Sequence, residues 1–502
     1  MNSLKILIPA LVLLGGAVHA VHAQPARVTA DPTDFHFLVD GRPFVPLGYY
    51  ITEGTLAELK YLRSHHVNTV ILYYYAIAEH YHVPPDTGSY HARYLRGLKP
   101  YLDSLQRYNI KAIVDLQAKL AERGVQGFTA EGILSIVHAY KSHPAVFGWL
   151  IEEEGYYQFR TKGYPTWRYV GDLKARINAE DPGHPVVFVE TNTTLDGTTF
   201  FGEGESDYHG NELYDILGYD KYVYDGRKGR QGEEYSDVNL VSREAVHRIM
   251  PQIAARRKYG LLFIAQCVDR APEIITPDYP PLTSQQVWYQ SLSPIIRGAR
   301  GLLYWWRQPD PAVEYSSSPA TLRQTDGFFD WFTRHGLADV ITRGINKKQR
   351  VRLGSLAGVD SLTILSKDAS LDSTRVSWKF YQWQHFNNYG FHKKTRETRF
   401  ARHDDPSLSD PDFLLFDFMA RQMGNTYYLF AANDYRLQVR TRFILDRMIA
   451  PGRRVTRVVE LDPSGEERRL PVTRNARTGK VAIELRFEGH SVKAIRIETG
   501  SI

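Results

Sequence analysis

Cysteine is almost absent from this chain, with Cys267 the only one among 502 residues. A single thiol cannot form an intrachain disulfide, so the fold depends on its hydrophobic core. The neighbouring Ile264 and Val268 are apolar and predict a buried, unreactive thiol rather than a nucleophile.

Long apolar runs are missing after the N-terminus. Residues 1–23 combine Lys5, an apolar run over 6–18 and the small-residue motif Val21-His22-Ala23. This pattern is typical of a Sec signal peptide cut before Gln24, with a cut after Ala20 as the alternative. No later segment approaches the roughly 20 apolar residues of a membrane-spanning helix. We therefore expect an exported mature protein, periplasmic or extracellular, without an integral membrane segment.

Several motifs of cofactor and metal chemistry are also missing. The histidines show no H-x-x-x-H or H-E-x-x-H spacing, which disfavours a catalytic zinc. No G-x-G-x-x-G turn follows the first apolar run, and no G-x-S-x-G elbow of a serine esterase occurs. The net charge of +6 comes with scattered arginines, which disfavours a nucleic-acid partner and is compatible with an acidic glycan. We expect no cofactor and no metal.

Eight short apolar runs are present, at intervals of 24 to 46 residues. They cover 44–50, 68–75, 110–116, 146–152, 185–191, 215–222, 261–267 and 301–306. Most are almost continuously apolar, as parallel strands buried on both faces are. Helical patterns lie between them, over 55–66, 129–142, 167–179, 242–257 and 283–297. The alternation predicts a TIM (β/α)8 barrel over 32–344; a doubly wound sheet would rarely need eight such units.

The pattern changes after about residue 345. Strand-like runs such as NTYYLFAAND, RRVTRVVEL and GKVAIELRF replace the alternation, separated by turn signals such as DPSG. This predicts an all-β region over 345–502, most simply a β-sandwich, with a long loop between 366 and 415.

Polar and aromatic residues follow the predicted barrel strands, at the end of the barrel that carries the active site in this architecture. Carboxylates, amides and aromatic rings at one mouth favour a carbohydrate site over a phosphate or metal site. The candidate substrate-binding residues are Tyr49, Tyr73, Glu152, Glu153, Glu190, Tyr222, Gln266, Trp305 and Trp306. Tyr50 and Asp115 also end strands, and we assign them no role. Strand alternation predicts that Trp305 and Trp306 face opposite sides, one toward the pocket and one under the helices.

The segment HPAVFGWLIEEE resembles the fourth-strand motif of clan-A glycoside hydrolases. There a His-Pro precedes an apolar strand, and a tryptophan stands five residues before the acid/base glutamate. The residue five positions after Trp149 is Glu154, so the resemblance implies that Glu154 is the general acid/base. FLVDGRPFVPLGYY and IIRGARGLLYWW are similar to the first and last parts of such barrels, and the segment ending EGHSVKAIRIE resembles their accessory β-sandwich. The individual family is not identified by these motifs.

The three glutamates at 152–154 suit the chemistry that the resemblance implies. A general acid for glycosidic cleavage needs a carboxyl group whose pKa is raised by burial and by neighbouring negative charge. Adjacent glutamates raise one another's pKa, and strand alternation predicts that Glu152 and Glu154 face the same side. The alternative is a solvated loop start with salt-bridged glutamates.

Two positions depart from the clan's pattern. Glu153 stands where the clan has asparagine, and Gln266 stands where the resemblance places the nucleophilic glutamate. An amide cannot form the glycosyl-enzyme intermediate of a retaining mechanism. The second carboxylate then comes from Asp220, Asp269 or Glu273, or the enzyme inverts, or catalysis has been lost.

The sequence therefore predicts an exported glycoside hydrolase acting on an oligo- or polysaccharide. The alternative is a non-catalytic carbohydrate-binding protein on a hydrolase-like barrel, which Gln266 favours. A purely structural exported protein would explain the aromatic and acidic barrel mouth less well.

Overall fold

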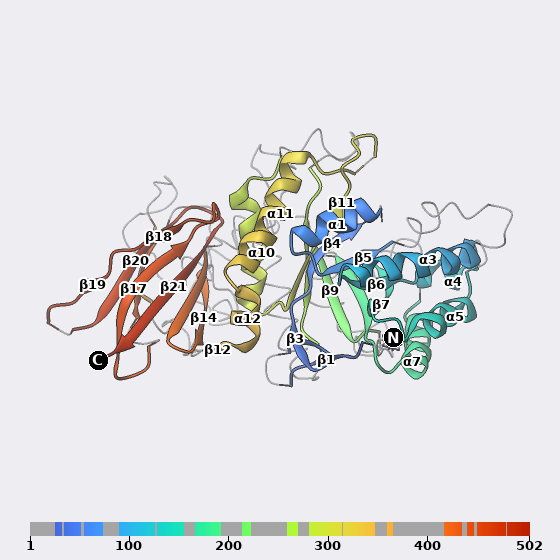
Figure 1. Cartoon of the computed structure of the whole chain (residues 1–502), viewed down its shortest axis with the longest axis horizontal. Helices are drawn as coiled ribbons and strands as arrows, with labels where there is room; N and C mark the ends of the chain where they lie inside the picture. Colours follow the sequence, from blue (N-terminus) through green and yellow to red (C-terminus); the bar gives the residue numbers. More distant parts are fainter. Residues whose placement is uncertain are drawn as a thin grey trace, which may run out of the picture.

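The computed structural model of the chain contains an eight-stranded parallel barrel with helices outside it and three antiparallel sheets (Figure 1). The structure describes residues 26–32, 35–51, 55–73, 90–125, 128–154, 166–191, 213–221, 259–269, 281–313, 315–346, 359–364, 416–433, 439–445, 449–477 and 479–502.

The barrel consists of the eight strands that the apolar runs predict. They are β4 (Leu47–Ile51), β5 (Thr69–Leu72), β6 (Lys111–Asp115), β7 (Val146–Glu153), β8 (Val186–Thr191), β9 (Ile216–Lys221), β10 (Leu262–Gln266) and β11 (Gly301–Arg307). Each strand pairs in parallel with the next, and β11 pairs with β4, so the barrel is closed. The prediction of a (β/α)8 barrel is confirmed.

Threonine or serine N-caps begin five of the helices outside the barrel. Eight helices outside the barrel are described. They are α1 (Leu56–Ser64), α3 (Tyr90–Arg107), α4 (Ala118–Glu122), α5 (Ala130–Tyr140), α7 (Trp167–Glu180), α10 (Ser284–Arg297), α11 (Pro319–Arg334) and α12 (Leu337–Arg343). Thr283 forms a full capping box with Gln286 at the start of α10. The helix predicted over 242–257 lies outside the described residues.

A small sheet covers the N-terminal end of the barrel. It contains β1 (Val28–Ala30), β2 (Phe37–Val39) and β3 (Arg42–Phe44). Phe37 and Phe44 each pack on Phe147 near the start of β7, with ring centroids 5.6 Å apart. The candidate site therefore lies at the opposite end, where the strands finish.

The C-terminal sheets form a sandwich. The first has the order β12 (Ile345–Asn346), β14 (Phe416–Met423), β15 (Thr426–Asn433), β21 (Ser491–Ser501), β17 (Arg453–Leu461), β18 (Glu467–Arg469). The second has the order β13 (Val359–Ile364), β16 (Val439–Ile444), β20 (Val481–Phe487), β19 (Thr473–Arg474). Phe418 of one sheet meets Phe443 of the other edge-to-face at 5.5 Å, which marks their shared core.

Helix α10 connects the barrel to the sandwich. It lies between the barrel strands and the first sheet (Figure 1), and sheet residues Phe430, Ala432 and Ala494 belong to the same apolar core as the barrel's outer face. The Gln285 amide donates to the backbone oxygen of Gly489 at 2.9 Å. The two parts of the chain thus share one continuous core through α10.

Candidate active site

A β-bulge in β7 decides which of the three glutamates enters the barrel. Leu150 pairs with Val187 of β8, but the next pair joins Glu152 to Phe188, so Ile151 is the additional residue. Leu150 and Val187 lie in the barrel interior, whereas Phe188 belongs to the core outside it. The expected strict alternation is therefore wrong at this point.

Because of the bulge, the side chains of residues 152 and 153 each face the side opposite to the one that regular alternation predicts. Glu153 pairs with Val189, whose side chain is in the barrel interior. Glu152 faces outward to α4. Of the two glutamates within β7, Glu153 is thus the one that enters the barrel.

Two aromatic residues on other strands hold Glu153. The Tyr73 hydroxyl, just after β5, donates to Glu153 Oε1 at 3.0 Å. Trp305 Nε1, on β11, donates to the same hydroxyl at 2.6 Å. Because an indole nitrogen only donates, the Tyr73 oxygen accepts this bond and its one hydrogen goes to Glu153 Oε1. Oε1 is therefore an acceptor, and the proton of a neutral Glu153 is on Oε2.

Burial raises the pKa of Glu153 well above its ordinary value. The negative charges of Asp220, Glu154 and Asp115 raise this pKa further, in that order, while Lys119 opposes them. A carboxyl group in this environment keeps its proton at higher pH than an exposed glutamate does. It can therefore act as a general acid.

Two further carboxylates and a tyrosine surround Glu153 at the ends of the strands. Asp115 ends β6 and is fixed by Gln117, whose side-chain amide donates to Oδ2 at 2.7 Å. Asp220 lies on β9 and is buried. The Tyr50 ring is 5.2 Å from the Tyr73 ring, and burial followed by the charges of Glu153, Asp220 and Asp115 raises its pKa well above the ordinary value. The mouth is therefore acidic.

Glu152 has a structural role. Its carboxylate accepts from the backbone nitrogens of Lys119 at 2.7 Å and Glu153 at 3.1 Å, and Lys119 Nζ lies 3.1 Å away. Burial alone would lower the pKa of Lys119, but Glu152, Glu153 and Asp115 raise it to about 12. The pair joins the end of β7 to the start of α4, so Glu152 does not face a substrate.

Tyr49 and Asp269 lie outside the candidate site. The Tyr49 hydroxyl is 2.8 Å from Asp326 Oδ1, behind the barrel wall on α11. The Asp269 carboxylate accepts from the backbone nitrogen of Ser318 at 2.7 Å and from the hydroxyls of Ser318 and Thr321. These bonds cap the start of α11, so Asp269 is not available as the second carboxylate.

Trp305 and Trp306 lie on the same side. Their peptide bond is cis, and their rings stack at 5.4 Å with an angle of 9° between the planes. The Trp306 ring also meets Tyr73 edge-to-face at 5.7 Å. The expectation of opposite faces is wrong, and both tryptophans line the interior beside Tyr73.

The remaining candidates vary in position. Gln266 ends β10 in register with Trp305, and its amide donates to the backbone oxygen of Val268 at 2.9 Å. Glu190 is buried and pairs with Tyr219, whose side chain lies in the core outside the barrel. Glu154 directly follows β7, half-buried, with a left-handed φ of 52°. Tyr222 and Glu273 lie outside the described residues.

Tyr50 and Asp115 both end predicted strands, but the sequence alone assigns them no role. Their side chains belong to the site because they point into the barrel. This orientation follows from the pairing registers of the barrel strands, which a single sequence does not show. Within the described part of the chain, no group of three or more His, Cys, Asp or Glu side chains is placed to hold a metal ion. None of the described helices is long and apolar enough to cross a membrane.

Comparisons with known proteins agree with this architecture. No family model and no curated protein matches the chain. A solved glycoside hydrolase matches with a TM-score of 0.53 and 10% identity, covering 94% of this chain and 97% of its own. A family 5 glycoside hydrolase from Bacteroides vulgatus matches with a TM-score of 0.54 and 12% identity, covering 94% of this chain and 93% of its own. A putative glycoside hydrolase from the same bacterium matches with a TM-score of 0.52 and 13% identity, covering 95% of this chain and 83% of its own. At these identities the likeness concerns the fold, and this chain has the fold of these glycoside hydrolases over nearly its whole length.

Proposed function

We propose that this chain is an exported glycoside hydrolase acting on an oligo- or polysaccharide, with Glu153 as its general acid. The observation that carries the proposal is the inward Glu153 carboxyl, whose Oε1 accepts from Tyr73 and whose raised pKa favours the protonated form that a general acid needs. The stacked tryptophans beside it offer the apolar surface on which a sugar ring packs.

Cleavage requires a second carboxylate, and we assign this role to Asp220. It lies on β9 at the same end of the barrel, and its charge is the neighbouring charge that raises the pKa of Glu153 most. Glu153 gives its Oε2 proton to the glycosidic oxygen as the bond to the anomeric carbon breaks. Asp220 either attacks that carbon or takes a proton from the attacking water; the anomeric configuration of the first product distinguishes the two.

The sequence resemblance points to Glu154 instead, so the test compares the two glutamates. We expect Glu153→Gln to lower kcat by about 10²- to 10⁴-fold on a cleaved glycan, because this is what a general acid contributes. Glu154→Gln is the matched control, with the same change in charge and shape, and we expect it to keep most of the activity. Loss in Glu154→Gln with activity retained in Glu153→Gln would assign the acid to Glu154.

A carbohydrate-binding protein without catalysis is the second candidate. Gln266 favours it, because its amide occupies the strand end where the resemblance expects a nucleophile. A panel of oligosaccharides and polysaccharides separates the two functions. If the wild type binds a glycan and releases no product from it, the hydrolase proposal fails.

Export rests on the signal-like residues 1–23. We expect the mature protein, expressed with its own N-terminus in a Gram-negative host, to begin at Gln24 and to leave the cytoplasm. Mass spectrometry of the intact protein from fractionated cells measures both.

A further inference from the structure

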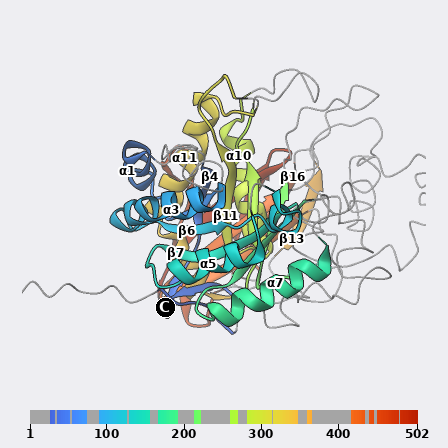
Figure 2. The ribbon, with the colours of Figure 1, turned by 90° about the vertical axis from the view of Figure 1, so that its right-hand side faces the viewer.

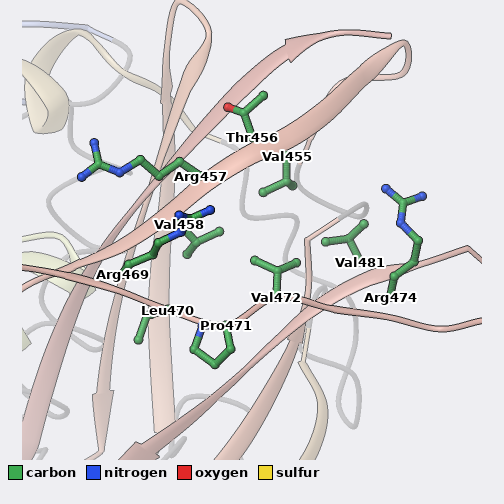
Figure 3. Close-up of a pocket in the computed structure, with 10 residues that line it drawn as sticks. All are labelled: Val455, Thr456, Arg457, Val458, Arg469, Leu470, Pro471, Val472, Arg474 and Val481. Atoms are coloured by element: carbon green, nitrogen blue, oxygen red, sulfur yellow. The ribbon is translucent and has the colours of Figure 1, made fainter.

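A surface groove lies at one edge of the sandwich, away from the barrel (Figure 3). Its volume is about 330 Å³, and it forms where the chain passes from the first sheet to the second. The residues that line it are Val455, Thr456, Arg457, Val458, Arg469, Leu470, Pro471, Val472, Arg474 and Val481.

The groove is apolar in the middle and positive at its ends. Arg457 and Arg469 lie at one end and Arg474 at the other, with Val472 between them (Figure 3). Val458 is fully buried beneath the groove, whereas 41% of Val472 is exposed in it. None of the described residues that line it is acidic or aromatic. A ligand that fits therefore has separated negative charges on a partly apolar body.

Two of the three arginines have no carboxylate partner among the described residues. Arg457 pairs with Glu467 at 3.3 Å and with Glu498 at 3.6 Å. Arg469 and Arg474 form no ion pair with any residue that the structure describes. A guanidinium can bind a carboxylate through two parallel hydrogen bonds, and a free one does so without first giving up a partner.

The charge of the whole chain is concentrated in the part that carries this groove. Residues 416–502 contain 16 Lys and Arg against 10 Asp and Glu, an excess of +6 that equals the net charge of all 502 residues. The preceding 415 residues are therefore neutral overall. A polymer with repeated negative charge is attracted to the sandwich rather than to the acidic barrel mouth.

We propose that this groove binds an acidic polysaccharide, with uronate carboxylates on Arg469 and Arg474 and the sugar's C–H face on Val472 and Pro471. A polymer is favoured over a small anion because the positive ends are separated by an apolar stretch. Neutral glycans are disfavoured because the described lining of the groove offers no aromatic ring for stacking. This binding is independent of hydrolysis at the barrel.

The test measures binding of the full chain to polygalacturonate by affinity electrophoresis, with a neutral galactan as the second polymer. We expect retardation by the polyuronate only, and at least a tenfold loss of affinity in Arg469→Ala/Arg474→Ala. The control is Arg440→Ala/Arg486→Ala, which removes the same charge from two exposed, cross-strand residues of the second sheet. The control should lose less than threefold.

Three results would overturn the proposal. These are an equal loss in both double variants, equal retardation by the neutral galactan, and full competition by double-stranded DNA at the same charge concentration. The first and third would indicate attraction by net charge alone. Because no turnover is measured, none of these results depends on whether the barrel hydrolyses a glycan.

Discussion

At the scale of single residues, the hydrogen-bond chain from Trp305 through Tyr73 to Glu153 defines the candidate site. It joins β11, the end of β5 and β7, three strands that do not neighbour one another. Tyr73 acts as a positioning residue, because it fixes which oxygen of Glu153 faces a substrate. It also stabilises the carboxylate that remains once the proton has left.

Removing the Tyr73 hydroxyl should therefore raise the pKa of Glu153. A hydrogen bond to a charged group contributes about 1.5–3 kcal/mol, and one pKa unit equals about 1.4 kcal/mol, so Tyr73→Phe should raise the pKa by about one to two units. The raised pKa keeps the acid protonated to higher pH, so the alkaline limb of the pH–rate profile should move upward while kcat falls.

Infrared titration of the carboxyl band that Glu153→Gln removes measures this pKa without a substrate. Tyr140→Phe is the matched control, because that hydroxyl donates to the backbone oxygen of Leu95, away from the site. A Glu153 pKa that does not change in Tyr73→Phe contradicts the positioning role.

At the scale of elements, the sequence predicts the strands well and their registers poorly. The eight barrel strands are recognisable because continuous apolar runs are typical of strands buried on both faces. The bulge at Ile151 is not recognisable from the sequence, because nothing in LIEEEG distinguishes it from regular alternation. It brings Glu152 into contact with Lys119, which is 33 positions away in the sequence. The sequence does not predict strand β14 either, because polar residues interrupt its apolar residues in FDFMARQM.

The pair of Glu152 and Lys119 should stabilise the end of β7. Lys119→Met leaves the fully buried Glu152 carboxylate without its cation, and we expect the free energy of unfolding in urea to fall by about 3 kcal/mol. The double variant Glu152→Gln/Lys119→Met removes both charges and should recover more than half of that loss. Equal destabilisation of the single and double variants would show that the ion pair has no such role.

At the scale of the whole molecule, helix α10 makes the barrel and the sandwich one cooperative unit. The first sheet presents Phe430, Ala432 and Ala494 to the barrel's helices, and these residues share the barrel's core. Shared apolar burial of this kind couples the unfolding of the two parts. Six of the eight tryptophans lie at or before residue 331, so fluorescence mainly reports the barrel.

A charge introduced on the sandwich side of this interface should therefore also lower the stability of the barrel. Ala432 is completely buried, and Ala432→Glu should lower the midpoint of the tryptophan-fluorescence melt by at least about 5 °C, because burying an unpaired charge costs several kcal/mol. Thr473→Glu, at an exposed position of β19, is the control and should change the midpoint little. An unchanged barrel melt in Ala432→Glu would mean that the two parts unfold independently.

The rigid packing of α10 also has a kinetic consequence for a long polymer. Two sites joined by a flexible linker share a ligand at an effective concentration that falls as the linker lengthens. Here the distance and orientation between the sandwich groove and the barrel mouth are fixed by a packed core. A polymer that reaches from the groove to Glu153 must therefore span one set distance, and shorter chains can occupy only one of the two sites at a time.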